Sequence, residues 1–157
     1  MVELIQNIMM LLDKKTNFYF TISNNPGIQG SKFYNNIFLK NKKNSLYLPV
    51  AISKLKDFEN FIKFLKKKII KVNGLSISMP FKKMSVKFAD YKHFSVLNAK
   101  NANTLVFKRD KIYAYNTDYM AAKQILKKKK FKNYIILGAG SLANTFISLI
   151  KKDNIFI

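Results

Sequence analysis

Segments whose apolar residues have the pattern of a β-strand alternate along this chain with segments whose apolar residues have helical spacing. Short runs rich in β-branched and aromatic residues predict strands, and apolar residues three or four positions apart predict helices. The predicted strands cover residues 17–22, 45–50, 69–78, 134–137 and 154–157, with a hairpin over 104–115 that turns at 108–111. The predicted helices cover residues 2–13, 31–40, 54–68, 118–129 and 141–151, with a helical turn at 82–86. This alternation predicts an α/β fold with an open, mostly parallel sheet.

Single residues refine this prediction. Ser31 is the expected N-cap of the helix that ends near Lys40, and Thr117 or Asp118 that of the helix that ends near Lys129. Pro49 predicts that strand 45–50 lies at an edge or ends there, because proline has no N–H for a ladder. In helix 54–68 the lysines fall opposite one apolar face, which predicts that they face solvent. That apolar face consists of Leu55, Phe58, Phe61, Ile62 and Leu65.

Composition narrows the possible functions. The 157 residues are 48% hydrophobic and 24% charged, as in folded proteins. Without cysteine there is no disulfide, cysteine nucleophile or cysteine-ligated metal, and a single histidine, His93, excludes a multi-histidine metal site. No apolar run approaches the roughly 18 residues of a membrane span. The N-terminus has its acid early and its lysines late, unlike a signal peptide. We therefore expect a cytoplasmic protein with no metal and no membrane partner.

The net charge of +21 raises the question of a nucleic-acid partner. Of the 29 basic residues only Arg109 is arginine, and Asn, Ile and Phe are also abundant. Lys, Asn, Ile and Phe share AT-rich codons, so compositional drift explains the excess, and a selected nucleic-acid binder would favour arginine for bidentate contacts. Nucleic-acid binding is the disfavoured alternative. The summed field still favours small anionic ligands.

A glycine turn between a strand and a helix forms the first chemical motif. Gly138, Gly140 and Ala143 fit the G-x-G-x-x-G/A pattern of dinucleotide-binding folds. Such a turn binds pyrophosphate through backbone N–H groups, or it is merely structural. The cofactor-binding candidates are Gly138, Ala139, Gly140, Ser141, Leu142 and Ala143. The residue that would separate NAD from NADP would follow the next strand, beyond Ile157.

A second set of polar residues stands where strands end, which is where α/β sheets bind ligands. It comprises Ser76, Ser78 and Lys82 around a Pro-Phe stop, Asn103-Thr104 before the hairpin, and Asn116-Thr117-Asp118 after it. Together these side chains could bind a polyhydroxylated molecule. The alternative is that the asparagines and Asp118 are turn residues and caps, and that Lys82 is one lysine among many.

These motifs, taken in order, resemble the shikimate dehydrogenase family, and in particular its shikimate dehydrogenase-like branch. The resemblance rests on Gly74-Leu-Ser-Ile-Ser-Met-Pro-Phe-Lys82, Asn103-Thr104, Tyr115-Asn-Thr-Asp118 and Gly138-Ala-Gly140. It implies reversible, NADP-linked reduction of 3-dehydroshikimate to shikimate, a step of chorismate and aromatic amino acid biosynthesis, or the same reaction on a related ring acid. NAD stays open as the cofactor. By resemblance, Lys82 and Asp118 match the catalytic pair, and Ser76, Ser78 and Asn103 match substrate-binding positions.

The chain departs from the family in two places. The family's Ser-x-Ser loop is replaced by Ile28-Gln-Gly-Ser31, so only Ser31 could offer a hydroxyl there, and substrate identity stays open. The second departure is length, because this chain is shorter than the members of the family. The resemblance therefore implies a substrate-binding domain over 1–118 and an incomplete NAD(P)-binding Rossmann-type domain over 119–157, as in a truncated reading frame. A non-catalytic substrate-binding domain is therefore the alternative to an oxidoreductase, and the oligomeric state is not predicted.

Overall fold

A six-stranded sheet organises the molecule. The computed structural model describes residues 12–128, 133–150 and 155–156 of the 157, so the helix predicted over 2–13 falls almost wholly outside the described residues. The strand order is β2-β1-β3-β5-β6-β4. The strands are β1 (Asn17–Ser23), β2 (Ser45–Ala51), β3 (Val72–Ile77), β4 (Tyr91–Lys92), β5 (Thr104–Lys108) and β6 (Lys111–Tyr115). Only β5 pairs antiparallel with both of its neighbours, so the expected open, mostly parallel sheet is confirmed.

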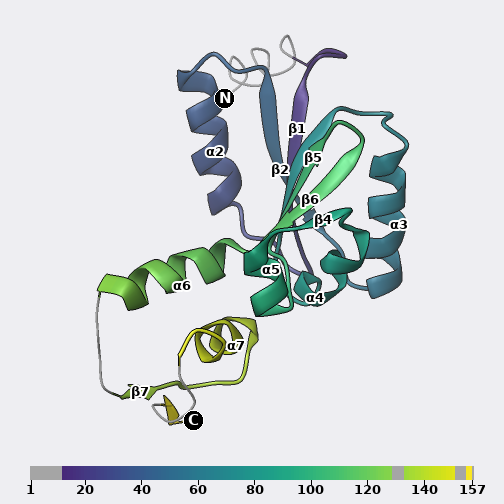
Figure 1. Ribbon diagram of the computed structural model, residues 1–157. Coiled ribbons are helices and arrows are strands. Elements are labelled where there is room, and N and C mark those ends of the chain that lie inside the picture. Colours follow the sequence, from purple (N-terminus) through teal and green to yellow (C-terminus); the bar gives the residue numbers. More distant parts are fainter. Residues whose placement is uncertain (1–11, 129–132, 151–154, 157) are drawn as a thin grey trace.

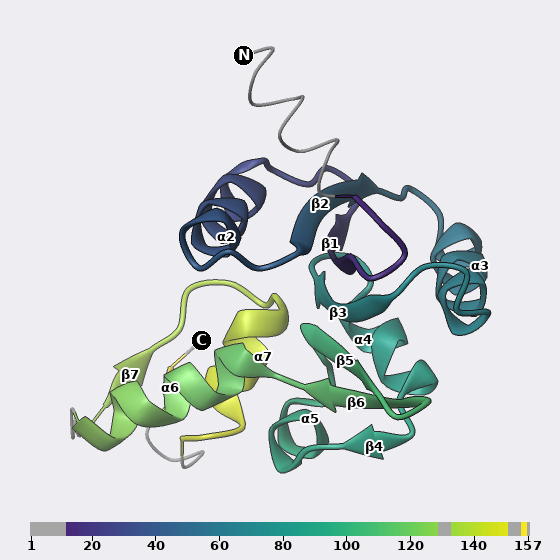
Figure 2. The same ribbon diagram turned by 90° about the horizontal axis from the view of Figure 1, so that it is seen from above.

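Helices connect the strands and cover the sheet. They are α2 (Gln29–Lys40), α3 (Leu55–Lys66), α4 (Lys82–Ser85), the 3₁₀ turn η1 (Val86–Phe88), α5 (Phe94–Ala99), α6 (Thr117–Lys128) and α7 (Ser141–Ile147). Helices α2 and α3 lie on opposite sides of the strands (Figure 1). Viewed from above, α6 and α7 lie beside the sheet on the side where α2 lies (Figure 2). A second, two-stranded sheet pairs β7 (Tyr134–Ile135) in parallel with β8 (Ile155–Phe156).

The hydrophobic core lies between α3 and one face of the sheet. Strand residues at every second position point into it, because successive side chains of a strand alternate between faces. The core contains Phe20 and Ile22 of β1, Leu75 and Ile77 of β3, Leu105 of β5, and Ile112 and Ala114 of β6, packed with Phe58, Ile62 and Leu65 of α3. The predicted apolar face of this helix is correct apart from Leu55, its first residue, which is 52% exposed.

The opposite face of the sheet carries aromatic and small polar residues. It forms one wall of a cleft of about 530 Å³, and α2 forms the other wall. Tyr19 of β1 packs against Phe38 of α2, with ring centroids 5.3 Å apart. Further along this face Ser76 and Thr104 stand directly opposite each other on β3 and β5. The edge position expected from Pro49 is also confirmed, because β2 is an outer strand.

Several elements differ from the sequence prediction. Strand β7 is shorter than the predicted 134–137, and Ile135 and Leu137 are exposed rather than buried. Helix α7 ends at Ile147, before the predicted end at 151. Helix α2 begins at Gln29 and has Ile28 as its N-cap, because the Lys32 N–H already donates to the Ile28 carbonyl at 3.0 Å. Ser31 is therefore not the N-cap. The short strand β4 and helix α5 had not been predicted at all. Helix α6 begins at Thr117 rather than at Asp118, so Asp118 lies in its first turn.

The hairpin β5–β6 turns where the sequence predicts. Arg109 and Asp110 form its tip, and both have positive φ angles, 47° and 63°. Two consecutive residues with positive φ are typical of the type I′ turns that match the twist of a two-residue hairpin. No helix among the described residues is long and apolar enough to cross a membrane.

Candidate functional site

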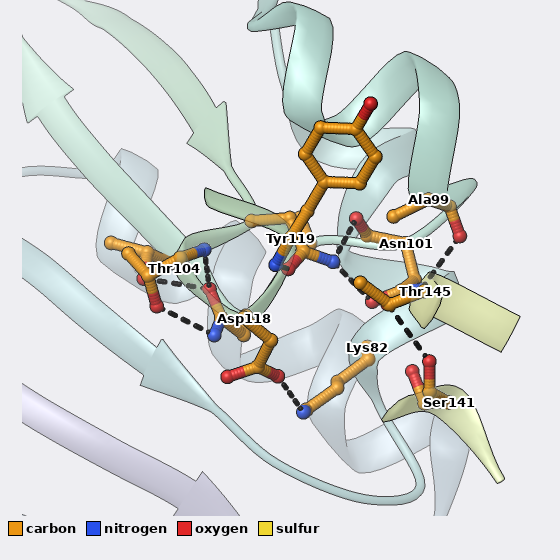
Figure 3. Close-up of polar contacts among 12 residues, drawn as sticks. Lys82, Ala99, Asn101, Thr104, Asp118, Tyr119, Ser141 and Thr145 are labelled. Atoms are coloured by element: carbon orange, nitrogen blue, oxygen red, sulfur yellow. Dashed lines mark hydrogen bonds and ion pairs between the residues drawn. The ribbon is translucent and has the colours of Figure 1, made fainter. Parts of the chain in front are cut away.

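Lys82 and Asp118 form an ion pair at the end of the sheet. Lys82 Nζ lies 2.7 Å from Asp118 Oδ2, and the side chains are 18% and 33% exposed. Lys82 opens α4 just after β3, and Asp118 is the second residue of α6 just after β6. The fold thus brings together two residues that stand at strand ends in the sequence. Figure 3 shows the two side chains pointing toward each other.

A tight turn places Lys82 at the start of α4. The Met79–Pro80 peptide bond is cis. The Phe81 N–H donates to the Ser78 carbonyl at 3.0 Å and closes the turn, and the Ser78 N–H donates to the Ile22 carbonyl of β1 at 2.8 Å. The Phe81 ring is fully buried and stacks on Phe58, with centroids 4.7 Å apart. The residue before Lys82 is thus anchored in the core, while Lys82 itself is directed toward Asp118.

Asn116 starts the helix that carries Asp118. Its side-chain Oδ1 accepts a hydrogen bond from the Tyr119 N–H at 2.8 Å, which is the pattern of an N-cap three residues before the donor. The expected caps Thr117 and Asp118 are therefore wrong by one or two residues. Strand β6 ends at Tyr115, so Asn116 is the first residue free to take the cap position. This start leaves the Asp118 carboxylate available to Lys82.

Asn103 binds the same first turn of α6. Its amide oxygen accepts from the Thr117 N–H at 2.9 Å and from the Thr104 hydroxyl at 3.0 Å. Its amide nitrogen donates to the Thr117 hydroxyl at 2.8 Å. The structure thus brings Asn103 next to the residue that precedes Asp118, and it gives Asn103 a bracing contact that sequence reasoning had not predicted.

The three candidate serines lie in different environments. Ser76 lines the cleft under α2, and Ser78 is exposed in the turn that leads to Lys82. Ser31 lies in the first turn of α2, where its hydroxyl is buried and has no hydrogen-bond partner among the described residues. Ser76 on β3 and Ser78 in the turn after it therefore both lie on the segment that leads to Lys82. Ser31 presents no accessible hydroxyl. Substrate-binding roles for all three remain predictions.

The glycine turn leads from β7 into α7. Gly138 has a φ of +107°, a conformation that favours glycine, and Gly140 is the N-cap of α7. A Cβ atom at either glycine would meet nothing within 4 Å. Ala139 and Leu142 are exposed, and Ser141 and Ala143 are partly buried. The Ser141 carbonyl accepts from the buried Thr145 hydroxyl at 3.0 Å (Figure 3). The turn therefore presents open backbone, which is the property that the motif requires.

Three other carboxyls of the described chain have a lowered pKa. Hydrogen bonds from the Lys15 N–H to Asp13, from Lys63 to Glu59 and from the Ile112 N–H to Asp90 are the main causes that hold the pKa of these three carboxyls below its usual value. No group of three or more His, Cys, Asp or Glu side chains among the described residues could hold a metal ion.

Comparison with known proteins gives relatives named shikimate dehydrogenase or shikimate dehydrogenase-like protein, although no family model matches the chain. A shikimate dehydrogenase-like protein of Haemophilus influenzae is 28% identical over 146 residues, which are 91% of this chain and 52% of that protein. The shikimate dehydrogenase (NADP(+)) of Aquifex aeolicus is 30% identical over 117 residues, 70% of this chain and 41% of that protein.

Solved structures agree. A shikimate 5-dehydrogenase-like protein gives a TM-score of 0.75 at 30% identity and covers 88% of this chain and 51% of its own. The shikimate dehydrogenase of Aquifex aeolicus, at 23% identity, shares the fold with a TM-score of 0.76 over 92% of this chain and 55% of its own. The chain thus spans about half the length of the curated relatives it matches.

Proposed function

The chain belongs to the shikimate dehydrogenase family, and we propose that it carries the substrate-binding part and the catalytic pair of a cytoplasmic, NADP-linked oxidoreductase of that kind. The substrate is 3-dehydroshikimate, reduced reversibly to shikimate, or a related polyhydroxy ring acid. In this proposal residues 1–118 form the substrate-binding and catalytic domain, and residues 119–157 belong to the NAD(P)-binding domain. The Lys82–Asp118 pair at 2.7 Å is the observation that carries the proposal.

Lys82 is the proton donor in the direction of reduction. As hydride reaches the carbonyl carbon, negative charge develops on the carbonyl oxygen, and a Lys82 ammonium within hydrogen-bond reach gives that oxygen a proton. Asp118 holds the ammonium on one side through Oδ2 and so aims its remaining protons at the substrate. The oxidation of the alcohol follows the same path in reverse. Lys82 is only 18% exposed, which limits competition from water.

The glycine turn fits one part of the cofactor. Open space surrounds the positions where Gly138 and Gly140 would carry a side chain, so a pyrophosphate can approach the backbone closely. NADP, when bound there, supplies the hydride. Gly138, Ala139, Gly140 and Ser141 would contact its phosphates, and Leu142 and Ala143 continue the same segment into α7.

The substrate side of the proposal uses residues on β3 and at the start of β5. Ser76 and Ser78 precede Lys82 along one strand and its turn, and Asn103 lies beside the start of α6. Hydroxyl and amide groups both donate and accept hydrogen bonds, as recognition of several ring hydroxyls requires. We include Ser31 only as a residue whose hydroxyl would need to become exposed when substrate binds.

The decisive experiment compares two neighbouring lysines. Oxidation of NADPH by 3-dehydroshikimate is followed by absorbance for the wild type, Lys82→Ala and Lys83→Ala. We expect Lys82→Ala to lower kcat by about 10²–10⁴-fold, the usual contribution of a positioned general acid, with a much smaller change in KM. The exposed Lys83 is the matched control and should have little effect. Equal losses from both variants would show that local charge, rather than a specific proton donor, matters.

The same preparation separates the oxidoreductase from a non-catalytic binding domain. Titration of the wild-type chain with shikimate, followed by nuclear magnetic resonance (NMR), reports binding independently of turnover. Binding with turnover supports the proposal. Binding without any turnover would favour the non-catalytic alternative, and the absence of both would reject the substrate class.

A further inference from the structure

Buried asparagines join the segments that carry the two charged residues. Asn116 is fully buried and Asn101 is 3% exposed. The Asn116 amide nitrogen donates to the Asn101 side-chain oxygen at 2.8 Å and to the Asn101 carbonyl at 3.1 Å. The Asn101 amide nitrogen in turn donates to the Ala99 carbonyl at 2.7 Å. Figure 3 shows Ala99 and Asn101 of this group.

The Asn116 amide uses both its nitrogen and its oxygen. The amide nitrogen donates to two oxygens of Asn101, and the amide oxygen caps α6 through Tyr119. The Asn116 main-chain N–H also donates to the buried Ser95 hydroxyl at 2.9 Å. A helix N-cap alone can be Ser, Thr, Asp or Asn, but among these only asparagine offers a cap acceptor and two donors at once. A simple capping role therefore leaves the Asn101 contacts unexplained.

The residue after Asn101 is tied to Lys82. The Ala102 N–H donates to the Lys82 carbonyl at 2.9 Å. The buried Ser85 hydroxyl lies 2.9 Å from both the Lys82 carbonyl and the Ala102 carbonyl, and it can donate to one of them at a time. Residues 101–102 thus contact the start of α4 on one side and the start of α6 on the other. The Lys82–Asp118 ion pair joins the starts of α4 and α6 directly, so these contacts form a closed ring.

We propose that Asn116 is a positioning residue for the Lys82–Asp118 pair. It fixes the first turn of α6 against residues 101–102, which hold the backbone of Lys82, and so sets the distance across which the two side chains meet. The effect of Asn116 on turnover rests on the proposed function, whereas its effect on the geometry of the Lys82–Asp118 pair does not. A displacement of about 1 Å in a catalytic group can lower turnover about 10²-fold, so a residue that contacts no substrate can still control the rate.

The test uses Asn116→Ser, because serine is as good an N-cap as asparagine and lacks the two donors. The matched control is Asn98→Ser, an exposed asparagine whose amide nitrogen donates to the Phe94 carbonyl one turn earlier in α5. The Lys82 ammonium is observed by NMR in lysine labelled with ¹⁵N, and its signal is identified by its loss in Lys82→Arg. We expect hydrogen exchange of this ammonium to rise at least tenfold in Asn116→Ser and to stay unchanged in Asn98→Ser.

A second variant covers loss of folding. Asn101→Ala removes the side-chain acceptor of the Asn116 amide and leaves the cap of α6 in place. A folded Asn116→Ser or Asn101→Ala chain with unchanged Lys82 exchange would overturn the proposal. If both variants fail to fold, Asn116 is a folding residue, and the positioning role is rejected as well.

Kinetics then distinguish this proposal from the proposed function. In an active wild type, we expect Asn116→Ser to lower kcat about 10²-fold with nearly unchanged KM, at a temperature where both proteins are folded. A matching rise in KM with unchanged kcat would contradict positioning of the proton donor. If the wild type shows no turnover, the proposed function fails, and the ammonium exchange still decides whether Asn116 positions the pair.

Discussion

Replacing Phe58 by alanine tests whether the core under α3 supports the site. The Phe58 ring is fully buried, stacks on Phe81 at 4.7 Å and meets the edge of Phe88 at 5.9 Å. Truncating such a ring loses its buried area and two aromatic contacts and leaves a cavity, which together cost about 3–5 kcal/mol. With a urea m-value of roughly 1.5 kcal/mol/M, the unfolding midpoint should fall by about 2 M or more. The expected loss of stability is a large part of the free energy of unfolding of a typical domain, which is about 5–15 kcal/mol.

The control for this substitution lies on the same helix. Phe64 is 41% exposed, and Phe64→Ala should cost less than about 1 kcal/mol. Because Phe81 directly precedes Lys82, Phe58→Ala should also increase hydrogen exchange of the Lys82 ammonium under conditions where the chain stays folded. A loss below about 1.5 kcal/mol for Phe58→Ala, or equal losses for Phe58 and Phe64, would refute the core described above.

Three further experiments test other parts of the chain. Arg109→Asn should stabilise the hairpin by about 0.5–1 kcal/mol in urea unfolding, because asparagine tolerates the positive φ of 47° better than arginine. The lowered pKa of Asp90, caused first by the Ile112 N–H and then by lysines, means that its charged form stabilises the fold above its ordinary pKa of 3.8. The stability difference between the wild type and Asp90→Asn should therefore shrink as the pH falls below about 4 in a series of thermal unfolding curves. Glutamine in place of several exposed lysines should change the unfolding free energy by less than about 0.5 kcal/mol per site. These lysines are Lys63, Lys66, Lys67 and Lys68.

The long elements of the fold could be predicted because their side-chain pattern is also their burial pattern. Helix α3 is the clearest case, since Phe58, Ile62 and Leu65 repeat at helical spacing and all three are buried. Strand β4 and helix α5 are too short for a period to show, with two and six residues. The residue after α5, Lys100, has a φ of 53°, and glycine at that position would have given a recognisable stop signal.

The Lys82–Asp118 pair could be predicted from the sequence, but the hydrogen bonds that hold the two segments together could not. Lys82 and Asp118 stand at strand ends, and strand ends of an α/β sheet meet at one edge. Contacts such as Asn116 to Asn101 join residues that the sequence separates by a whole hairpin, and no local pattern marks them. The one available signal was that Asn116 directly precedes a helix, which predicts a cap but not the partner of its amide hydrogens.

The reversed strand β5 also governs how the hairpin can change in length. Its ladder with β6 runs from Thr104 opposite Tyr115 to Lys108 opposite Lys111, and Asn103 and Asn116 flank the open end. Adding two residues to each arm next to Lys108 and Lys111 would lengthen the hairpin, keep every existing strand side chain on its face, and keep the same kind of pair beside the turn. One unmatched residue within an arm would invert the faces between the insertion and the tip, or force a bulge. The hairpin can therefore grow or shrink by paired steps at its far end, and the spacing of the site at its near end is insulated from such changes.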